Sequence, residues 1–382
     1  TLGALTVNST GTTTFSAAVS AASVTTNAGG TLSLNGGSIT TAGIQSYGEA
    51  TTLGQNTVLS AGAGNILFGS TLGGAYTLST TTTGGTTFTG AVGGTPLTGL
   101  TVTTATLNAG DITLVSNAAL SITNSGAGSV TGIIAGSGVT LTKTGAGTLT
   151  LSGANTYGGN TTVNGGTLAV SSTGTLGNNL STLAINSATV DLQRAVTVGS
   201  LLMSGTTPTI TNSTGTSSLE VSGISTLANT VTTSGLQTYT GAVTLGANTT
   251  LVSTDGASAI SLSSTVNGAY ALTINNSGAT TFGGIVGGSA ALTSITTDAG
   301  GTINLNGGAI TTTGAQTYNE QMTLGADTTL TSTGGASAIT LALVLKFFGA
   351  VFLSRTSRLV YQHPDSAFNL SRLEGKPLPL LA

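Results

Sequence analysis

Residues 138–170 of the chain read GVTLTKTGAGTLTLSGANTYGGNTTVNGGTLAV, and this stretch decides the fold. Short runs in which apolar residues alternate with Thr or Ser are separated by clusters of Gly and Asn. Side chains along a strand point to opposite faces with a period of two, so the alternation predicts strands. These fall at residues 139–142, 148–152, 161–163 and 167–170. The glycines between them supply the positive φ angles that tight turns need.

Each of these strands has one apolar face and one face covered by hydroxyl groups. A sheet of this kind must bury its apolar face. A chain that repeats the unit can do so by coiling on itself, so that each short strand stacks on the same strand of the next coil. We therefore expect an all-β fold, a parallel β-solenoid (β-helix) built from internal repeats.

The same residues resemble a known family. The strings LTKTGAGTLTLSGANTY at 141–157 and TTVNGGTL at 161–168 are similar to the autotransporter-associated β-strand repeat, also called the passenger-associated transport repeat. The resemblance covers residues 136–180, and the chain has one clear copy. It implies the secreted passenger region of a large bacterial surface protein, built as a parallel β-solenoid and exported with the help of this repeat.

The composition favours regular β structure over disorder. Charged residues are 4% of the 382, aromatic residues are 4%, Gly accounts for 59, and Cys and Trp are absent. Disordered chains usually combine high net charge with few β-branched residues, whereas here the net charge is −3 and Val, Ile and Thr recur at strand spacing. Only Lys143 and Arg194 are basic before residue 343, which argues against nucleic acid as a partner.

Internal repeats decide the architecture. Residues 28–47 recur at 299–318 with 14 of 20 positions identical, and residues 235–262 recur at 314–341 with 19 of 28 identical, an offset of 79 residues. These repeats predict β-solenoid segments at 1–135 and 181–342, with the transport-type repeat inserted at 136–180. No signal peptide is visible and the first residue is Thr1 rather than Met, so we expect a fragment of a longer protein.

Residues 343–382 form an atypical tail. They hold five of the seven basic residues, the one His and only two of the 59 Gly. Two interpretations stay open: a frameshift or junction that replaced the repeat, or an end cap in which the apolar residues 341–352 form an amphipathic helix and 366–374 a second helix. The apolar run is too short to span a bilayer, so we expect no membrane-spanning segment in this fragment.

Catalytic and metal-binding chemistry has little to work with in this sequence. His363, the sole histidine, lies in the tail, so a Ser-His-Asp or Cys-His site in the repeats is excluded. The ten acidic residues are scattered, no calcium-loop motif occurs, and the glycine clusters lack the Lys-Ser/Thr of a phosphate loop. We expect no enzyme, and no catalytic, cofactor-binding or metal residues.

Two recurring patterns leave alternatives open. Gln-x-Tyr appears at 45–47, 237–239 and 316–318, either as exposed rings that stack on sugars or as a structural device in which Tyr covers a corner and Gln bonds a turn. Thr runs suggest an ice- or carbohydrate-binding surface, although the Thr positions drift in the sequence and ice binding needs a strict repeat on one face. A β-helix enzyme acting on polysaccharides would need two carboxylates facing one groove.

The sequence thus predicts a non-enzymatic passenger fragment at the bacterial cell surface, outer membrane associated or extracellular. Its expected role is adhesion or extracellular scaffolding. The expected partners are a surface receptor or glycan of unknown identity, together with export machinery encoded elsewhere.

Overall fold

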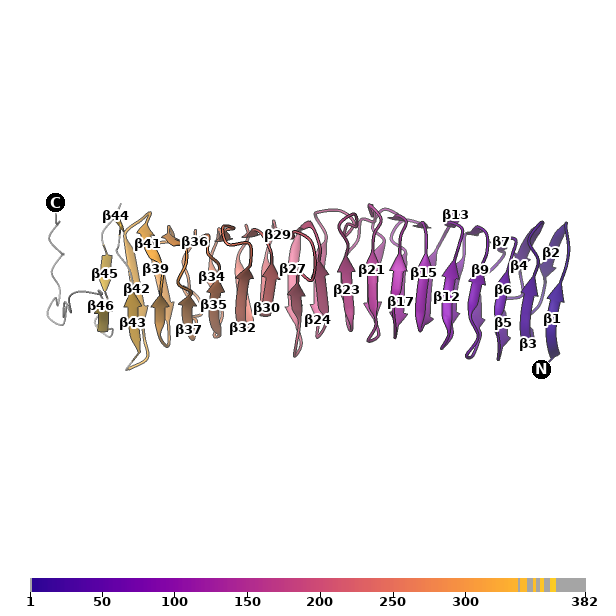
Figure 1. The fold of residues 1–382 in the computed structure, drawn as a ribbon, viewed down its shortest axis with the longest axis horizontal. Coiled ribbons are helices and arrows are strands. Elements are labelled where there is room, and N and C mark those ends of the chain that lie inside the picture. The colour runs from indigo at the N-terminus through magenta and orange to yellow at the C-terminus, as the bar shows by residue number, and fades with distance from the viewer. Residues whose placement is uncertain (1, 336, 342–345, 348–350, 354–357, 362–382) are drawn as a thin grey trace. The chain divides into compact units, whose positions relative to one another are not determined.

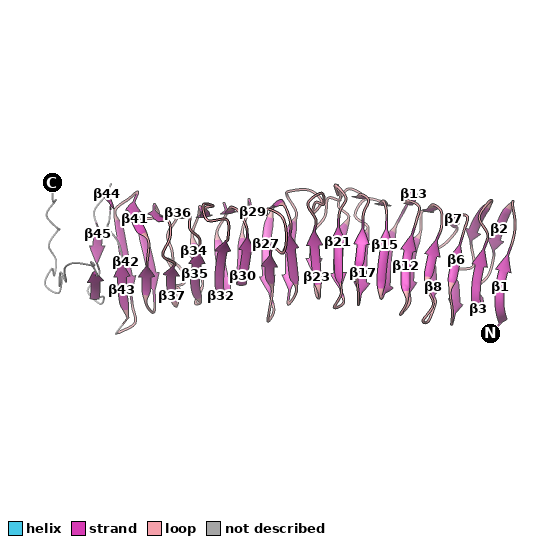
Figure 2. Ribbon diagram, in the orientation of Figure 1, coloured by secondary structure: helices cyan, strands magenta, loops and turns pink. Residues whose placement is uncertain are grey.

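The computed structural model describes residues 2–335, 337–341, 346–347, 351–353 and 358–361, and the chain divides into two compact units, Thr1–Arg194 and Ala195–Ala382. In the described ranges every regular element is a β-strand, joined to the next by turns and short loops (Figure 2). The strands pair in parallel with strands of the next turn, and each unit is a parallel β-solenoid (Figure 1). The predicted fold class is confirmed.

The first unit has three strand ladders. Ladder 1a contains β2 (Thr12–Phe15), β4 (Thr31–Leu34), β7 (Ala50–Leu53), β10 (Leu72–Gly73), β13 (Val92–Leu97), β16 (Ile112–Leu114) and β19 (Ile134–Ala135). Ladder 1b contains β5 (Ser38–Thr41), β8 (Thr57–Ser60), β11 (Thr77–Thr81), β14 (Gly99–Thr104), β17 (Ala119–Asn124), β20 (Thr140–Thr144), β22 (Thr161–Val163) and β24 (Thr182–Asn186). Ladder 1c contains β1 (Leu2–Val7), β6 (Gln45–Tyr47), β9 (Ile66–Phe68), β12 (Gly85–Phe88), β15 (Thr106–Ala109), β18 (Gly128–Val130), β21 (Thr148–Leu151), β23 (Thr167–Val170) and β25 (Thr189–Leu192). The long strand β3 (Val19–Thr26) turns the corner between ladders 1b and 1c, because it pairs with both β5 and β6.

The second unit also has three ladders. Ladder 2a contains β26 (Ala195–Val198), β29 (Ser218–Val221), β31 (Gln237–Tyr239), β33 (Ile260–Leu262), β36 (Ala279–Phe282), β38 (Thr302–Leu305), β41 (Gln321–Leu324) and β44 (Lys346–Phe347). Ladder 2b contains β27 (Ser200–Ser204), β34 (Val266–Asn267), β39 (Ala309–Thr312), β42 (Thr328–Ser332) and β45 (Val351–Leu353). Ladder 2c contains β28 (Thr209–Thr211), β35 (Ala271–Asn275), β37 (Ser294–Thr297), β40 (Gln316–Tyr318), β43 (Ala338–Leu341) and β46 (Arg358–Tyr361). The long strands β30 (Ser225–Thr233) and β32 (Val243–Ser253) each contribute to both 2b and 2c.

Like residues stack in register along the ladders. Leu100 pairs with Leu120, Leu120 with Leu141, and Leu141 with Thr161, so these turns take 20, 21 and 20 residues. The three leucines are at most 1% exposed. Between inward positions, Thr and Ser point outward, as the alternating pattern predicts. Each turn therefore buries its apolar side chains against the turns before and after it, and a continuous core results.

The decisive stretch folds almost as its pattern predicts. The strands expected at 139–142, 148–152, 161–163 and 167–170 are observed as β20, β21, β22 and β23, with shifts of at most two residues at their ends. These strands belong only to ladders 1b and 1c. Residues 152–160 and 171–181 take the place of ladder 1a as loops, so the transport-type repeat lacks the third strand of the preceding turns.

The sequence period is not a whole number of turns. Gln237 lies in β31 of ladder 2a, whereas its repeat partner Gln316, 79 residues later, lies in β40 of ladder 2c. Equivalent residues of the repeat therefore occupy different faces of the solenoid. A strand segment can change face in this way because every face offers the same alternation of inward and outward positions.

The helical interpretation of the tail is wrong where the structure describes it. The range 341–352 contains β44 and the start of β45 instead of a helix, and these strands extend ladders 2a and 2b by pairing with β41 and β42. The last turn of a solenoid presents unpaired strand edges, and pairing with them outweighs the marginal stability of a short helix. The second expected helix, at 366–374, lies outside the described residues. The expected division at 136–180 and 343–382 stays a prediction.

Candidate functional site

Buried hydrogen-bonded clusters lie at each Gln-x-Tyr repeat. In the first, Gln45 Nε2 donates to the carbonyl oxygens of Ile39 (3.1 Å) and Ser60 (2.8 Å) and to Thr41 Oγ1 (3.2 Å). The Tyr47 hydroxyl donates to Gln45 Oε1 at 2.9 Å. Ser60 belongs to the following turn, so one amide group ties together two coils.

The same geometry recurs in both other copies. Gln237 Nε2 donates to the carbonyls of Val231 and Val252 at 3.2 and 2.7 Å, and Tyr239 donates to Gln237 Oε1 at 3.0 Å. The third cluster joins Gln316 to the carbonyls of Ile310 and Thr331 and to the Tyr318 hydroxyl. All three Gln and all three Tyr are 0% exposed. The rings are therefore unavailable for stacking on sugars, and the clusters are structural.

Burial gives these tyrosines a distinct electrostatic state. It raises the pKa of Tyr47, Tyr239 and Tyr318 well above the ordinary value, since a phenolate inside the solenoid would lose its solvation. The Tyr47 ring also continues into an aromatic column: its centroid lies 5.1 Å from that of Phe68, which stacks on Phe88 at 5.3 Å. Neutral hydroxyls in an apolar column suit a structural core, not proton transfer.

Within the transport-type repeat, a buried lysine replaces an apolar core residue. Lys143 in β20 is 0% exposed and stacks between Ile122 and Val163 of the neighbouring turns. Its Nζ donates to the carbonyl oxygens of Thr144, Gly145 and Gly165, at 2.8, 3.0 and 3.2 Å. Burial lowers the pKa of Lys143 to about 8. Because Gly165 lies on the following turn, the ammonium group caps the corner carbonyls of two coils.

Asn155 and Tyr157 organise the loop that replaces ladder 1a. Asn155 Oδ1 accepts the backbone N–H of Ile134 on the preceding turn (2.8 Å), and its Nδ2 donates to the carbonyl of Thr175 on the following turn (2.7 Å). The Tyr157 hydroxyl lies 2.7 Å from Thr161 Oγ1, inside the core. One asparagine thus joins three consecutive turns where strand pairing stops.

The glycines of this repeat have two separate roles. Gly145 and Gly166 have φ angles of 78° and 63°, as the turn prediction requires. Gly147 and Gly153 are needed for a different reason: a Cβ atom would lie 2.0 Å from the Gly126 carbonyl oxygen in one case and 1.9 Å from that of Gly132 in the other. The coils therefore approach too closely for any side chain at these corners.

The outward hydroxyl groups are more regular than the sequence suggests. In ladder 1b, successive strands carry Ser or Thr at two adjacent outward columns. The first column is Ser38, Val58, Ser79, Thr101, Ser121, Thr142 and Thr162, and the second is Thr40, Ser60, Thr81, Thr103, Thr123 and Thr144. In ladder 2c, one column is threonine on seven successive strands: Thr209, Thr230, Thr250, Thr273, Thr296, Thr317 and Thr340. The drift of Thr positions in the sequence disappears in register.

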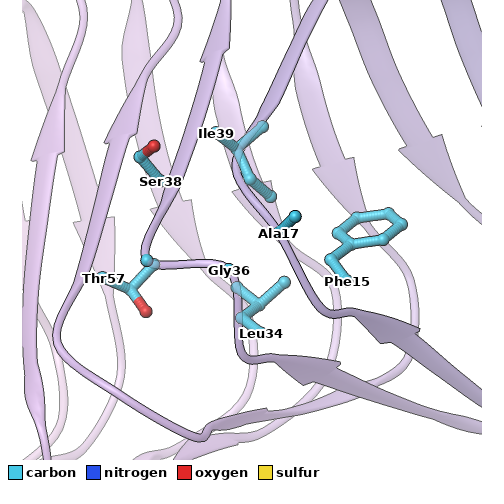
Figure 3. Close-up of a pocket in the computed structure, with 8 residues that line it drawn as sticks. Phe15, Ala17, Leu34, Gly36, Ser38, Ile39 and Thr57 are labelled. Carbon is cyan, nitrogen blue, oxygen red and sulfur yellow. The ribbon is translucent and has the colours of Figure 1, made fainter.

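One small hollow lies between the first turns, lined by Phe15, Leu34, Ile39 and neighbouring residues (Figure 3). Its walls are almost entirely apolar, and no water molecule fits inside it. It is a packing gap and does not resemble a substrate site.

Acidic residues are mostly apart, with one exception. In the described ranges no group of three or more His, Cys, Asp and Glu side chains could hold a metal ion. However, Glu320, at the start of a turn, lies beside Asp298 of the preceding turn. The sequence showed both residues but gave no sign that they would meet. The signal that could have found the buried position is the repeat itself, because Glu49 and Glu320 both follow the cluster tyrosine by two residues.

The described residues also contain no helix that is long and apolar enough to cross a membrane. Fold and buried clusters together define the class: a β-solenoid repeat protein whose coils are locked by internal side-chain to carbonyl hydrogen bonds.

Comparison with known families adds one specific match. Residues 141–170 match the family described as passenger-associated-transport-repeat, which confirms the resemblance in the sequence. The chain therefore carries an autotransporter passenger repeat, and its β-solenoid fold is consistent with an autotransporter passenger. A comparison with curated proteins found no match, and neither did one with solved structures.

Proposed function

We propose that this chain is a non-enzymatic part of an autotransporter passenger, displayed outside a bacterial cell, where it acts in adhesion or as an extracellular scaffold. The observation that supports the proposal is the matched repeat at 141–170, built into a solenoid through Lys143 and Asn155. The solenoid also offers a physical route for export. Each turn pairs only with its neighbours, so an emerging chain can add one coil at a time to those already folded.

The export part of the proposal can be tested with register-preserving deletions. Residues 141–182 comprise two complete turns, because Leu141 pairs with Thr161 and Thr161 with Leu183. Residues 78–119 comprise two turns of equal total length outside the matched repeat, bounded by the pairs Leu78 with Leu100 and Leu100 with Leu120. Either deletion lets the remaining strands pair in their native register.

Both deletions would be placed in the chain as passenger between a signal peptide and a translocating β-barrel in a laboratory Gram-negative strain. Surface exposure is read by protease treatment of intact cells. Loss of 141–182 should reduce the surface-exposed fraction, whereas loss of 78–119 should not. Equal export of both variants would refute a transport role for the repeat. Binding of displaying cells to host surfaces or glycan arrays then separates an adhesin from a scaffold.

The hydroxyl columns favour a second candidate function, ice binding. Ladder 1b offers a flat, uncharged surface on which Ser and Thr recur at the spacing between stacked strands, about 4.8 Å. A strict, rigid repeat of hydroxyl and methyl groups is what an ordered water lattice requires. Thermal hysteresis measurements on the purified chain test this function, with Thr101→Lys and Thr123→Lys as variants. Absence of a freezing-point gap in the unaltered chain would eliminate it.

A further inference from the structure

Glutamate occupies the same buried position in two copies of the repeat. Glu49 and Glu320 are each 2% exposed and follow the cluster tyrosines Tyr47 and Tyr318 by two residues. In the first copy Glu49 Oε2 accepts a hydrogen bond from the Thr26 hydroxyl. Beside Thr26 stands Asn27, a neutral residue whose Oδ1 accepts the Ser9 backbone N–H at 2.9 Å. This copy has one carboxylate and one hydroxyl partner.

The later copy differs in chemistry at the same place. Asp298 stands where the first copy has Asn27, so a second carboxylate faces the glutamate. The equivalent hydroxyl, Thr297 Oγ1, lies 3.3 Å from the Asn319 backbone nitrogen, from which it can accept a hydrogen bond. Both carboxylate oxygens of Glu320 are buried and make no hydrogen bond. Asp298 is anchored by its Oδ1, which accepts the Asn276 N–H at 3.2 Å.

Two carboxylates in this setting require a positive partner. A buried ionised carboxylate without hydrogen bonds is strongly unfavourable, and a second carboxylate beside it adds repulsion. Burial, with a smaller contribution from Asp298, raises the pKa of Glu320 to about 8. Of the described groups packed against Glu320, Asp298 is the charged one that acts on it. The pair therefore holds either a proton or a cation.

We propose that Asp298 and Glu320 bind one divalent cation of the calcium type between two successive coils. The donors are carboxylate oxygens, supplemented by backbone carbonyls and water, and hard cations such as Ca²⁺ prefer such ligands. Two carboxylates make a weak site, comparable to extracellular modules with dissociation constants of roughly 0.1–1 mM. Cation binding displaces the shared proton, so affinity depends on pH. The site adds a stabilising link between coils and does not depend on the proposed export or adhesion role.

The test is calcium binding to the purified full chain after treatment with a chelator. Calorimetric titration and thermal unfolding are followed up to about 10 mM calcium, tenfold above the weak end of extracellular sites. The unaltered chain should bind one ion and unfold at higher temperature when calcium is present. With a competing proton of pKa about 8, the apparent affinity should fall about 50-fold between pH 8 and pH 6.

Three variants make the result specific. D298N recreates the arrangement of the first copy and keeps an oxygen for Asn276, so it should fold and lose the binding. E320Q should lose it as well. E49Q, the matched control at the first copy, should bind calcium like the unaltered chain. The proposal is overturned if the unaltered chain binds no calcium, if D298N binds as tightly, or if E49Q abolishes binding. A chain that shows pH-dependent stability without calcium binding holds only a proton there, which also overturns it.

Discussion

Replacing Gln45 by Leu tests the idea that the buried clusters lock the coils. Leu removes the bonds from Nε2 to the Ile39 and Ser60 carbonyls, each worth about 0.5–1.5 kcal/mol. It also leaves the fully buried Tyr47 hydroxyl without its acceptor, which costs about 1–3 kcal/mol. The local free energy of opening should therefore fall by about 2–6 kcal/mol.

A double substitution sharpens this prediction. Tyr47→Phe on its own leaves Gln45 Oε1 without a donor and should cost about 1–2 kcal/mol. The double variant Gln45→Leu/Tyr47→Phe removes both partners, so no hydroxyl is orphaned. We expect it to be more stable than Gln45→Leu alone, with a coupling energy of about 1 kcal/mol or more.

Solenoids open locally and need not unfold in two states, so the measurement is native-state hydrogen exchange at the amides of β6 and β8. Ser46→Ala is the matched control, because Ser46 lies between Gln45 and Tyr47 on the same strand but is only partly buried and points outward. The control should change exchange by less than about 0.5 kcal/mol. If Gln45→Leu behaves like Ser46→Ala, or if the double variant is the least stable of all, the clusters do not lock the coils.

Three further predictions concern single sites. Lys143→Met should destabilise the matched repeat by about 1–3 kcal/mol at pH 7, because three corner carbonyls lose their donor. Since burial lowers the pKa of Lys143 from 10.5 to about 8, the stability of the unaltered chain relative to this variant should rise from pH 8 to pH 10.5, and parallel pH profiles would contradict this. Gly147→Ala should cost more than about 3 kcal/mol because its Cβ meets a carbonyl oxygen, whereas Gly110→Ala, where nothing lies within 4 Å, should be neutral in thermal melts. Without calcium, the raised pKa of Glu320 stabilises the folded chain fully below pH 4.5, and this contribution is lost as the pH rises to about 8; Glu320→Gln should flatten the urea-unfolding profile over this range.

Local chemistry makes the elements of this fold readable from the sequence. Alternation of apolar residues with Thr and Ser places β20 to β23 within two residues, because strand periodicity and glycine turns act over a few neighbouring residues. The match at 141–170 follows from the same local pattern. Residue types alone also limit the chemistry of the repeats, because His and Cys are absent from them.

Only the tertiary structure decides which residues meet across coils. The 79-residue period suggests equivalent faces, yet Gln237 and Gln316 lie on different ladders, because each turn consumes a variable number of residues. The same variable spacing brings scattered threonines into seven-strand register in ladder 2c and sets Glu320 against Asp298. Turn length accumulates along a solenoid, so a small difference in each loop decides the partner of every later side chain. The sequence determines that this chain coils, and the stacking of its turns determines which side chains are brought together.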